Sequence, residues 1–96
     1  MIRVTVNYPT SEGSTFDHDY YKATHVPLCL STWTAAKSAS IDKGVNGPNV
    51  AAVHFTFDSM EAFGSAMAGE GTAAVMADVA NYTNITPVMQ ISEIIS

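Results

Sequence analysis

The chain has 96 residues, of which 47% are hydrophobic and 14% are charged, and its formal net charge is −5. This composition is too apolar and too weakly charged for a disordered chain, and the length suits one small folded domain spanning residues 1–96. With 9 acidic and 4 basic residues and no basic cluster, the chain lacks the positive patch that nucleic-acid binding requires.

The cysteine content and the length of the apolar segments indicate in which cellular compartment the protein resides. The single cysteine, Cys29, excludes an internal disulfide and favours a reducing setting. No apolar run approaches the ~20 residues of a membrane-spanning helix. The first residues alternate like a strand and lack the basic start and apolar core of a signal peptide. We therefore expect a cytoplasmic protein that does not enter the membrane.

The N-terminal third predicts a strand followed by a helix. Over residues 1–8, apolar side chains alternate with polar ones, which is typical of a half-buried strand. A turn-rich loop covers residues 9–15. A helix is then predicted over residues 16–31, with Asp17 placed to accept the free N–H groups of its first turn.

Pro27 interrupts this helix beside a histidine. Because proline has no N–H and its ring crowds the carbonyl one turn earlier, the helix is predicted to kink or loosen near His25. Tyr21 and His25 are an i,i+4 pair and share one face. A carbonyl freed beside an imidazole can orient it, so the stretch either builds a site or ends a helix.

The rest of the chain predicts three strands and two helices. Residues 38–43 form a short strand around Ile41, and residues 50–57 form a clearer strand after a glycine-rich turn. Residues 58–61 resemble a capping box with Asp58 as the cap. The helix after it places Met60, Phe63 and Met67 on one stripe.

A second short helix is predicted over residues 72–82 and a last strand over residues 88–95. The order is therefore β, α, β, β, α, β, which predicts an α+β, ferredoxin-like βαββαβ plait. Such a plait has a four-stranded antiparallel sheet with helices on one face only. For an apolar chain of this size, a second subunit is the economical cover for the open sheet face, so we expect a homodimer.

Several separate segments also resemble one protein family, in the same order along the chain. Phe-Asp-x-Asp-Tyr-Tyr at 16–21, followed by His-x-Pro-Leu at 25–28, resembles the signature of the EthD family in the dimeric α+β barrel superfamily. The resemblance continues through Ile-Asp-Lys-Gly at 41–44, Asp-Ser-Met-Glu-Ala-Phe at 58–63, Asn-Tyr-Thr-Asn-Ile at 81–85 and Pro-Val-Met-Gln-Ile-Ser-Glu at 87–93.

The resemblance implies a dimer whose two sheets meet back to back, with a pocket between each sheet and its helices. EthD proteins are associated with the breakdown of ethyl tert-butyl ether. The superfamily includes cofactor-free monooxygenases, lactone isomerases, cyclases and haem enzymes, so family membership leaves the reaction open. Val26 stands where many members carry methionine, and the loop at 44–49 is short, which leaves the substrate size open.

His25 is the best candidate for a general base, since an imidazole titrates near neutral pH. Tyr21 or Tyr20 could donate a hydrogen bond to a substrate oxygen. His54 lies on the polar face of its strand, and alternation alone does not decide whether that face meets the helices or a partner subunit. The residues expected to bind substrate are His54, Tyr82 and Trp33.

These residues support two hypotheses. The first is a cofactor-independent oxygenase, isomerase or dehydratase that uses His25 on a small hydrophobic or aromatic carbonyl compound. The second is a non-catalytic ligand-binding or accessory dimer in a degradation pathway, favoured by the scarcity of acid–base pairs. No HxH or CxxC spacing is present, so neither a metal nor another cofactor is expected.

Overall fold

The computed structural model describes residues 1–95. The strands are β1 (Ile2–Pro9), β2 (Ser38–Lys43), β3 (Asn49–Phe57) and β4 (Val88–Glu93). The helical elements are α1 (His18–Tyr20), the π-helical η1 (Tyr21–His25), α2 (Val26–Thr32), α3 (Met60–Met67), α4 (Thr72–Asp78) and the 3₁₀-helical η2 (Val79–Asn81).

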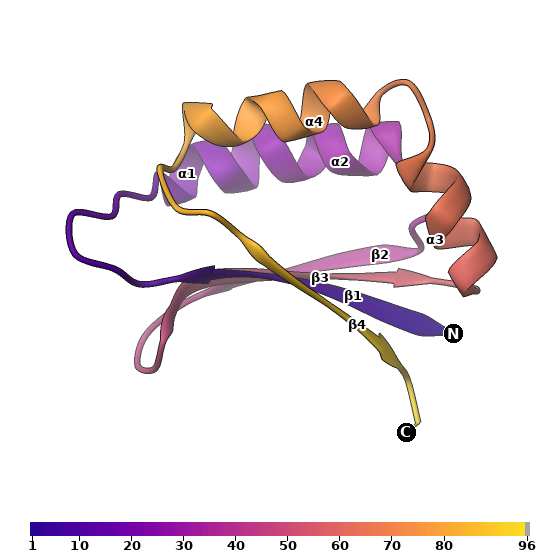
Figure 1. Cartoon of the computed structure of the whole chain (residues 1–96), viewed down its shortest axis with the longest axis horizontal. Helices are drawn as coiled ribbons and strands as arrows, with labels where there is room; N and C mark the ends of the chain where they lie inside the picture. The colour runs from indigo at the N-terminus through magenta and orange to yellow at the C-terminus, as the bar shows by residue number, and fades with distance from the viewer. Residues whose placement is uncertain (96) are drawn as a thin grey trace.

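The strands form one antiparallel sheet in the order β2-β3-β1-β4. All helices lie on the same face of this sheet, and α4 runs alongside the continuous helix made by α1, η1 and α2 (Figure 1). This is the ferredoxin-like plait expected from the order of elements. The short strand at residues 38–43, the weakest of the four patterns, is confirmed as β2.

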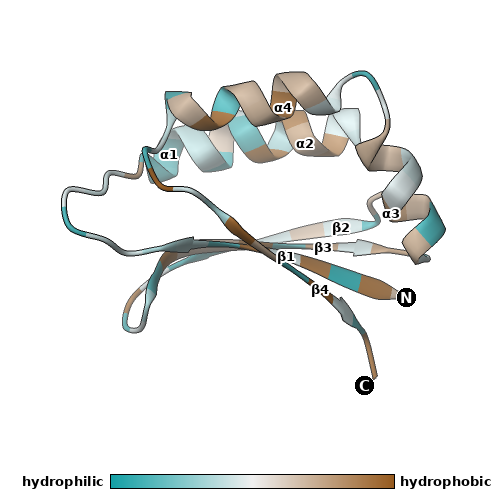
Figure 2. Ribbon diagram, viewed as in Figure 1, coloured by the Kyte–Doolittle hydropathy of each residue, from teal (hydrophilic) through white to brown (hydrophobic). Residues whose placement is uncertain are grey.

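The core lies between the helices and the inward face of the two central strands. Val4 pairs with Phe55 and Val6 with Val53, so apolar side chains from β1 and β3 point to the same side. Figure 2 shows apolar and polar residues alternating along β1. The inward face of the sheet therefore forms the floor of the space under the helices.

The first helix widens immediately before Pro27. Val26 donates its N–H to the carbonyl of Tyr21, five residues back, which defines the π-helical turn η1. Pro27 has no N–H to donate to the carbonyl of Ala23, so the α-helical hydrogen bond between these two residues cannot form. The predicted loosening near His25 is confirmed, and π-turns of this kind are frequent at functional sites.

Contacts at one end of the helical layer set the position of α4. A side-chain carbon added at Gly71 would lie 2.5 Å from the methyl group of Thr32, so glycine permits this close approach to α2. The indole N–H of Trp33 donates to the hydroxyl of Thr72 over 2.9 Å. Together these contacts fix the start of α4 against the end of α2 and leave Asp78, at the far end of α4, facing η1.

Two details of α3 differ from the predictions. Its cap is Ser59, whose hydroxyl accepts from the N–H of Ala62 over 3.1 Å, and not Asp58. Asp58 instead pairs with Lys37 at 3.4 Å, since the helix begins one residue later, at Met60, with Ser59 in the cap position. Met60 is exposed rather than part of the core, whereas Phe63 is buried.

The capping arrangement gives a direct test. Ser59→Ala should lower the free energy of unfolding by about 1 kcal/mol, because it leaves an N–H of the first turn without its acceptor. Asp58→Ala, which removes only an exposed ion pair, should change it by less than about 0.5 kcal/mol. Urea unfolding at one fixed protein concentration measures both. Equal losses would contradict the assignment of Ser59 as the cap.

Candidate active site

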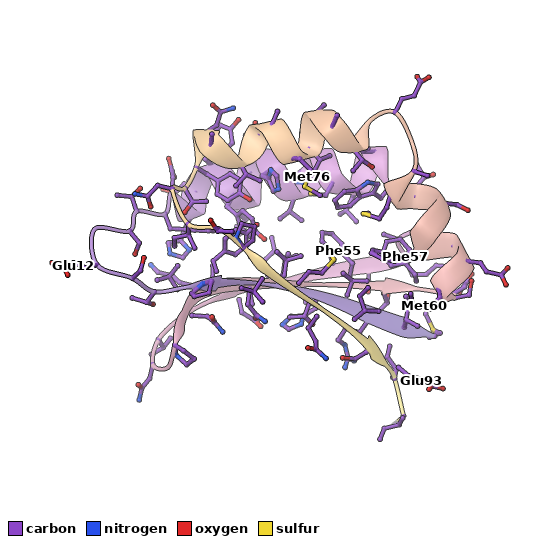
Figure 3. The ribbon with its side chains drawn as sticks, in the orientation of Figure 1. Glu12, Phe55, Phe57, Met60, Met76 and Glu93 are labelled. Carbon is purple, nitrogen blue, oxygen red and sulfur yellow. The ribbon has the colours of Figure 1, made fainter. Side chains whose placement is uncertain are left out.

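A cavity of about 260 Å³ lies between the sheet and the helices. Its wall is apolar except for Tyr8, Tyr21 and His25. Phe55 rises from the sheet and Met76 points down from α4 toward it (Figure 3). Met76 and Met89 line the cavity and are 49% and 43% exposed, so the cavity reaches the surface between α4 and β4.

His25 is held at the polar end of this cavity by a carboxylate. The imidazole is 4% exposed, and its Nδ1 lies 2.9 Å from Oδ2 of Asp78. Because the carboxylate can only accept, Nδ1 carries the hydrogen and Nε2 keeps its lone pair. Within residues 1–95, Nε2 makes no hydrogen bond, and it is not among the fully buried unpaired atoms, so this nitrogen keeps some accessible surface. The imidazole is therefore set up to accept a proton from a molecule in the cavity.

Asp78 is itself held by two further donors. Its Oδ1 accepts from the hydroxyl of Tyr20 over 2.7 Å and from the amide of Asn81 over 2.9 Å. Burial raises the pKa of this carboxyl, but the hydrogen bonds from Asn81, Tyr20 and His25 outweigh it and hold the pKa below its ordinary value. Asp78 is therefore ionised at neutral pH and can stabilise a positive charge on His25.

Aromatic rings fix the plane of the imidazole. The ring of Tyr21 stacks on that of His25 with centroids 5.5 Å apart and an interplanar angle of 15°. The ring of Tyr82 lies 4.5 Å from the imidazole. Packing from these rings and the bond to Asp78 leave His25 little freedom to turn, which is the kind of support that a precise site requires.

Tyrosine hydroxyls gather beside His25. The hydroxyls of Tyr8 and Tyr82 share a hydrogen bond of 2.6 Å. The hydroxyl of Tyr21 is buried and has no hydrogen-bond partner within residues 1–95. Burial raises the pKa of each of these tyrosines, so all three stay protonated at neutral pH and act as hydrogen-bond donors rather than bases.

The structure separates the predicted site residues into those in the cavity and those behind it. His25, Tyr21 and Trp33 line the cavity. Tyr20 donates to Asp78 and does not line the cavity, so it positions the carboxylate rather than touching a ligand. Tyr82 likewise stands behind the wall and supports Tyr8 and His25.

His54 does not line the cavity, so its expected role in binding substrate there is not supported, and of the two faces left open for it the structure gives it the one turned away from the helices. Its ring lies on the open face of the sheet, with Nδ1 2.9 Å from the hydroxyl of Thr5 and Nε2 2.9 Å from Asp42. The physical reason is strand alternation: β3 turns Val53 and Phe55 toward the helices, so His54 between them must point away.

Asp78 and Tyr8 are functional candidates that the sequence reasoning missed. Asp78 interrupts the apolar stripe of Val75, Val79 and Tyr82, and a carboxylate on a buried stripe is a signal of a polar partner inside. Tyr8 ends the inward face of β1, where its ring is buried and its hydroxyl needs a partner.

Cys29 also lines the cavity and is 2% exposed. Burial raises the pKa of its thiol to about 12. No group of three or more histidine, cysteine or carboxylate side chains within residues 1–95 could hold a metal ion. In the same part of the chain, no helix is both long enough and apolar enough to cross a membrane.

The lowered pKa of Asp78 predicts a loss of stability in acid. A carboxyl whose pKa is lower in the folded than in the unfolded chain stabilises the fold above the unfolded value of ~3.9, and this contribution disappears as the pH falls through the folded pKa. The amide of the Asp78→Asn variant does not ionise, so this contribution to stability is absent at every pH. We expect the difference in unfolding free energy between the wild type and this variant to shrink below about pH 4; a constant difference from pH 6 to pH 2 would contradict it.

Comparison with known proteins identifies a close relative. A crystal structure of an EthD-like protein from Ralstonia eutropha JMP134 matches 99% of this chain and 92% of its own, with 40% sequence identity and a TM-score of 0.91. An EthD family protein from Bacillus halodurans C-125 matches 99% of both chains, with 18% identity and a TM-score of 0.77.

At lower identity the likeness shows the fold alone. A dimeric protein with a ferredoxin-like fold from Bacteroides fragilis NCTC 9343 matches 97% of this chain and 95% of its own, with 8% identity and a TM-score of 0.64. No family model and no curated protein matches the chain. The Ralstonia relative shares 40% of its residues over almost the whole chain, together with the ferredoxin-like sheet and helices, and so the chain belongs to the EthD family.

Proposed function

We propose that this protein is a cofactor-independent enzyme that removes a proton from the carbon beside a carbonyl group of a small hydrophobic molecule. One observation carries the proposal: a buried imidazole has one nitrogen bound to a carboxylate and the other nitrogen free. That arrangement is typical of a histidine that acts as a general base. EthD membership supports a role in breaking down small molecules, and the single cysteine is in keeping with a reducing cytoplasm.

The proposed step uses groups on both sides of the imidazole. Nε2 of His25 takes the proton, and the carboxylate of Asp78 stabilises the imidazolium that forms. Electron density moves to the carbonyl oxygen, where the hydroxyl of Tyr21 donates a hydrogen bond to the developing negative charge. Oxygenation, isomerisation and dehydration can all begin with this step.

Exchange of hydrogen for deuterium tests the step without knowledge of the natural product. The methyl protons beside the carbonyl of acetophenone exchange in D₂O only if a base removes them. We expect the wild type to accelerate this exchange and His25→Gln to lose about 10²–10⁴-fold of the acceleration. Nuclear magnetic resonance follows the loss of the methyl signal.

A matched control lies on the same helix. Lys22→Gln changes an exposed side chain of η1 and should leave the exchange rate unchanged. Circular dichroism must show that both variants are folded. Undiminished exchange by folded His25→Gln would refute its role as the base. A wild type that binds acetophenone without exchanging its protons would favour the alternative of a non-catalytic binding protein.

We further propose that the open face of the sheet joins two copies of the chain. The face is poor in charge, with Arg3 and Asp42 near its margins, and interfaces are depleted in charged residues. Its other side chains are His54 and a mostly short set: Thr5, Asn7, Ser38, Ser40, Ala52, Thr56, Val88, Gln90 and Ser92. The Bacteroides protein of similar fold is described as dimeric, which supports a dimer without indicating its interface.

A charge placed in the middle of this face should separate the copies. Ala52 lies opposite Asn7 on the two central strands, so Ala52→Glu puts a carboxylate where the two sheets would meet. We expect sedimentation to show a dimer for the wild type and a monomer for this variant. Ala73→Glu, on an exposed position of α4, is the control and should remain dimeric. A dimeric Ala52→Glu variant would exclude this interface.

A further inference from the structure

The hydroxyl of Tyr21 is the starting point, because it is the one buried side-chain polar atom without a partner in residues 1–95. The residue is 1% exposed and lines the cavity. A buried hydroxyl that forms no hydrogen bond loses its interaction with water and gains nothing in exchange. Native proteins rarely leave such a group unpaired without a functional reason. The unused donor therefore points to an acceptor that enters with a ligand.

A second unused donor lies at the same end of the cavity. The hydroxyls of Tyr8 and Tyr82 are 2.6 Å apart and share one hydrogen bond, which uses only one of their two protons. Tyr8 lines the cavity and Tyr82 does not. When Tyr82 donates to Tyr8, the proton of Tyr8 is free to point into the cavity. The opposite direction would leave the proton of Tyr82 without an acceptor.

Tyr8 and Tyr21 do not satisfy each other. Their rings pack edge to face with centroids 5.4 Å apart. Besides burial, an interaction between the two hydroxyls adds to the raised pKa of Tyr21, so the hydroxyls lie near each other but not within hydrogen-bond distance. The hydroxyl of Tyr8 nevertheless makes its bond to Tyr82, and none forms to Tyr21. Two hydroxyl protons therefore remain for one incoming atom. A carbonyl oxygen has two lone pairs and can accept both.

We infer that Tyr21 and Tyr8 form a two-donor pocket for one oxygen atom of a neutral ligand whose remaining surface is hydrocarbon. The rest of the wall consists of aliphatic, aromatic and sulfur-containing side chains, with no lysine or arginine to pair with an anion. His25 is already paired with the carboxylate of Asp78, so a second carboxylate buried there would lack a counter-charge of its own. The inference deepens the proposed function by naming the class of substrate, and it rests on that function only in placing the oxygen beside His25.

The volume limits the size of this ligand. An apolar cavity of about 150 Å³ holds one benzene molecule. The cavity of about 260 Å³ therefore has room for a single substituted ring or a branched chain of similar bulk. A larger ligand would extend out of the cavity between α4 and β4, where Met76 and Met89 are exposed.

Three probes of similar size distinguish the parts of this inference. Acetophenone has one carbonyl oxygen, cumene has the same shape without it, and benzoate carries a charge. Trp33 is the only tryptophan and lines the cavity, so its indole N–H gives one signal that reports occupancy in a heteronuclear titration. The quantity to compare is the affinity for acetophenone divided by the affinity for cumene, because this ratio cancels the common hydrocarbon contribution.

Tyr21→Phe should lower this ratio roughly five- to tenfold, as expected for the loss of one hydrogen bond in an apolar site. Tyr8→Phe should lower it as well. Ser31→Ala is the control, because it removes an exposed hydroxyl that donates to the carbonyl of Leu28 outside the cavity, and it should leave the ratio unchanged. Benzoate should not displace acetophenone from the wild type.

Several results would overturn the inference: an unchanged ratio in Tyr21→Phe, displacement by benzoate, or no binding of acetophenone and cumene. The outcome is separable from that of the proposed function. A wild type with the predicted ratio but no proton exchange would keep the ligand class and remove the role of His25 as a base. Proton exchange that depends on His25 but not on Tyr21 or Tyr8 would keep the role of His25 as a base and exclude the two-donor pocket.

Discussion

The hydrogen bond between Asp78 and His25 is the interaction on which the site depends most. It joins the end of α4 to η1, two elements that are 53 residues apart in the chain. The same carboxylate receives the hydroxyl of Tyr20 and the amide of Asn81, so both helices are tied to one anion. This bond also selects the tautomer of His25, which leaves the basic nitrogen free. Removing the anion would thus alter the packing of the helical layer and the chemistry of the cavity together.

Pro27 makes the other contribution, and it acts through the backbone. By withholding an N–H it leaves the preceding turn in the wide π-helical form, in which Val26 donates to Tyr21. Tyr21 and His25 lie at the two ends of this turn with their rings stacked. The local sequence therefore places the base and the neighbouring hydroxyl on one surface, while the tertiary contact with Asp78 fixes the orientation of the imidazole.

The division between local and long-range causes explains what could be predicted. His25 could be singled out because Pro27 lies two residues away. The order of strands and helices could be predicted from the spacing of apolar residues along the chain. Asp78 escaped because its partner is distant in sequence and only the fold brings the two together. The choice between Ser59 and Asp58 as a cap depends on one backbone turn, which residue preferences do not resolve. The face taken by His54 depends on which side the helices cover.

The buried thiol of Cys29 is an unreactive part of the cavity wall. Thiolates, not thiols, attack electrophiles, and a pKa of about 12 leaves almost no thiolate at neutral pH. An electrophilic ligand such as an unsaturated ketone could therefore occupy the cavity without alkylating Cys29. At Cys29 the wall therefore acts as a small apolar surface rather than as a nucleophile.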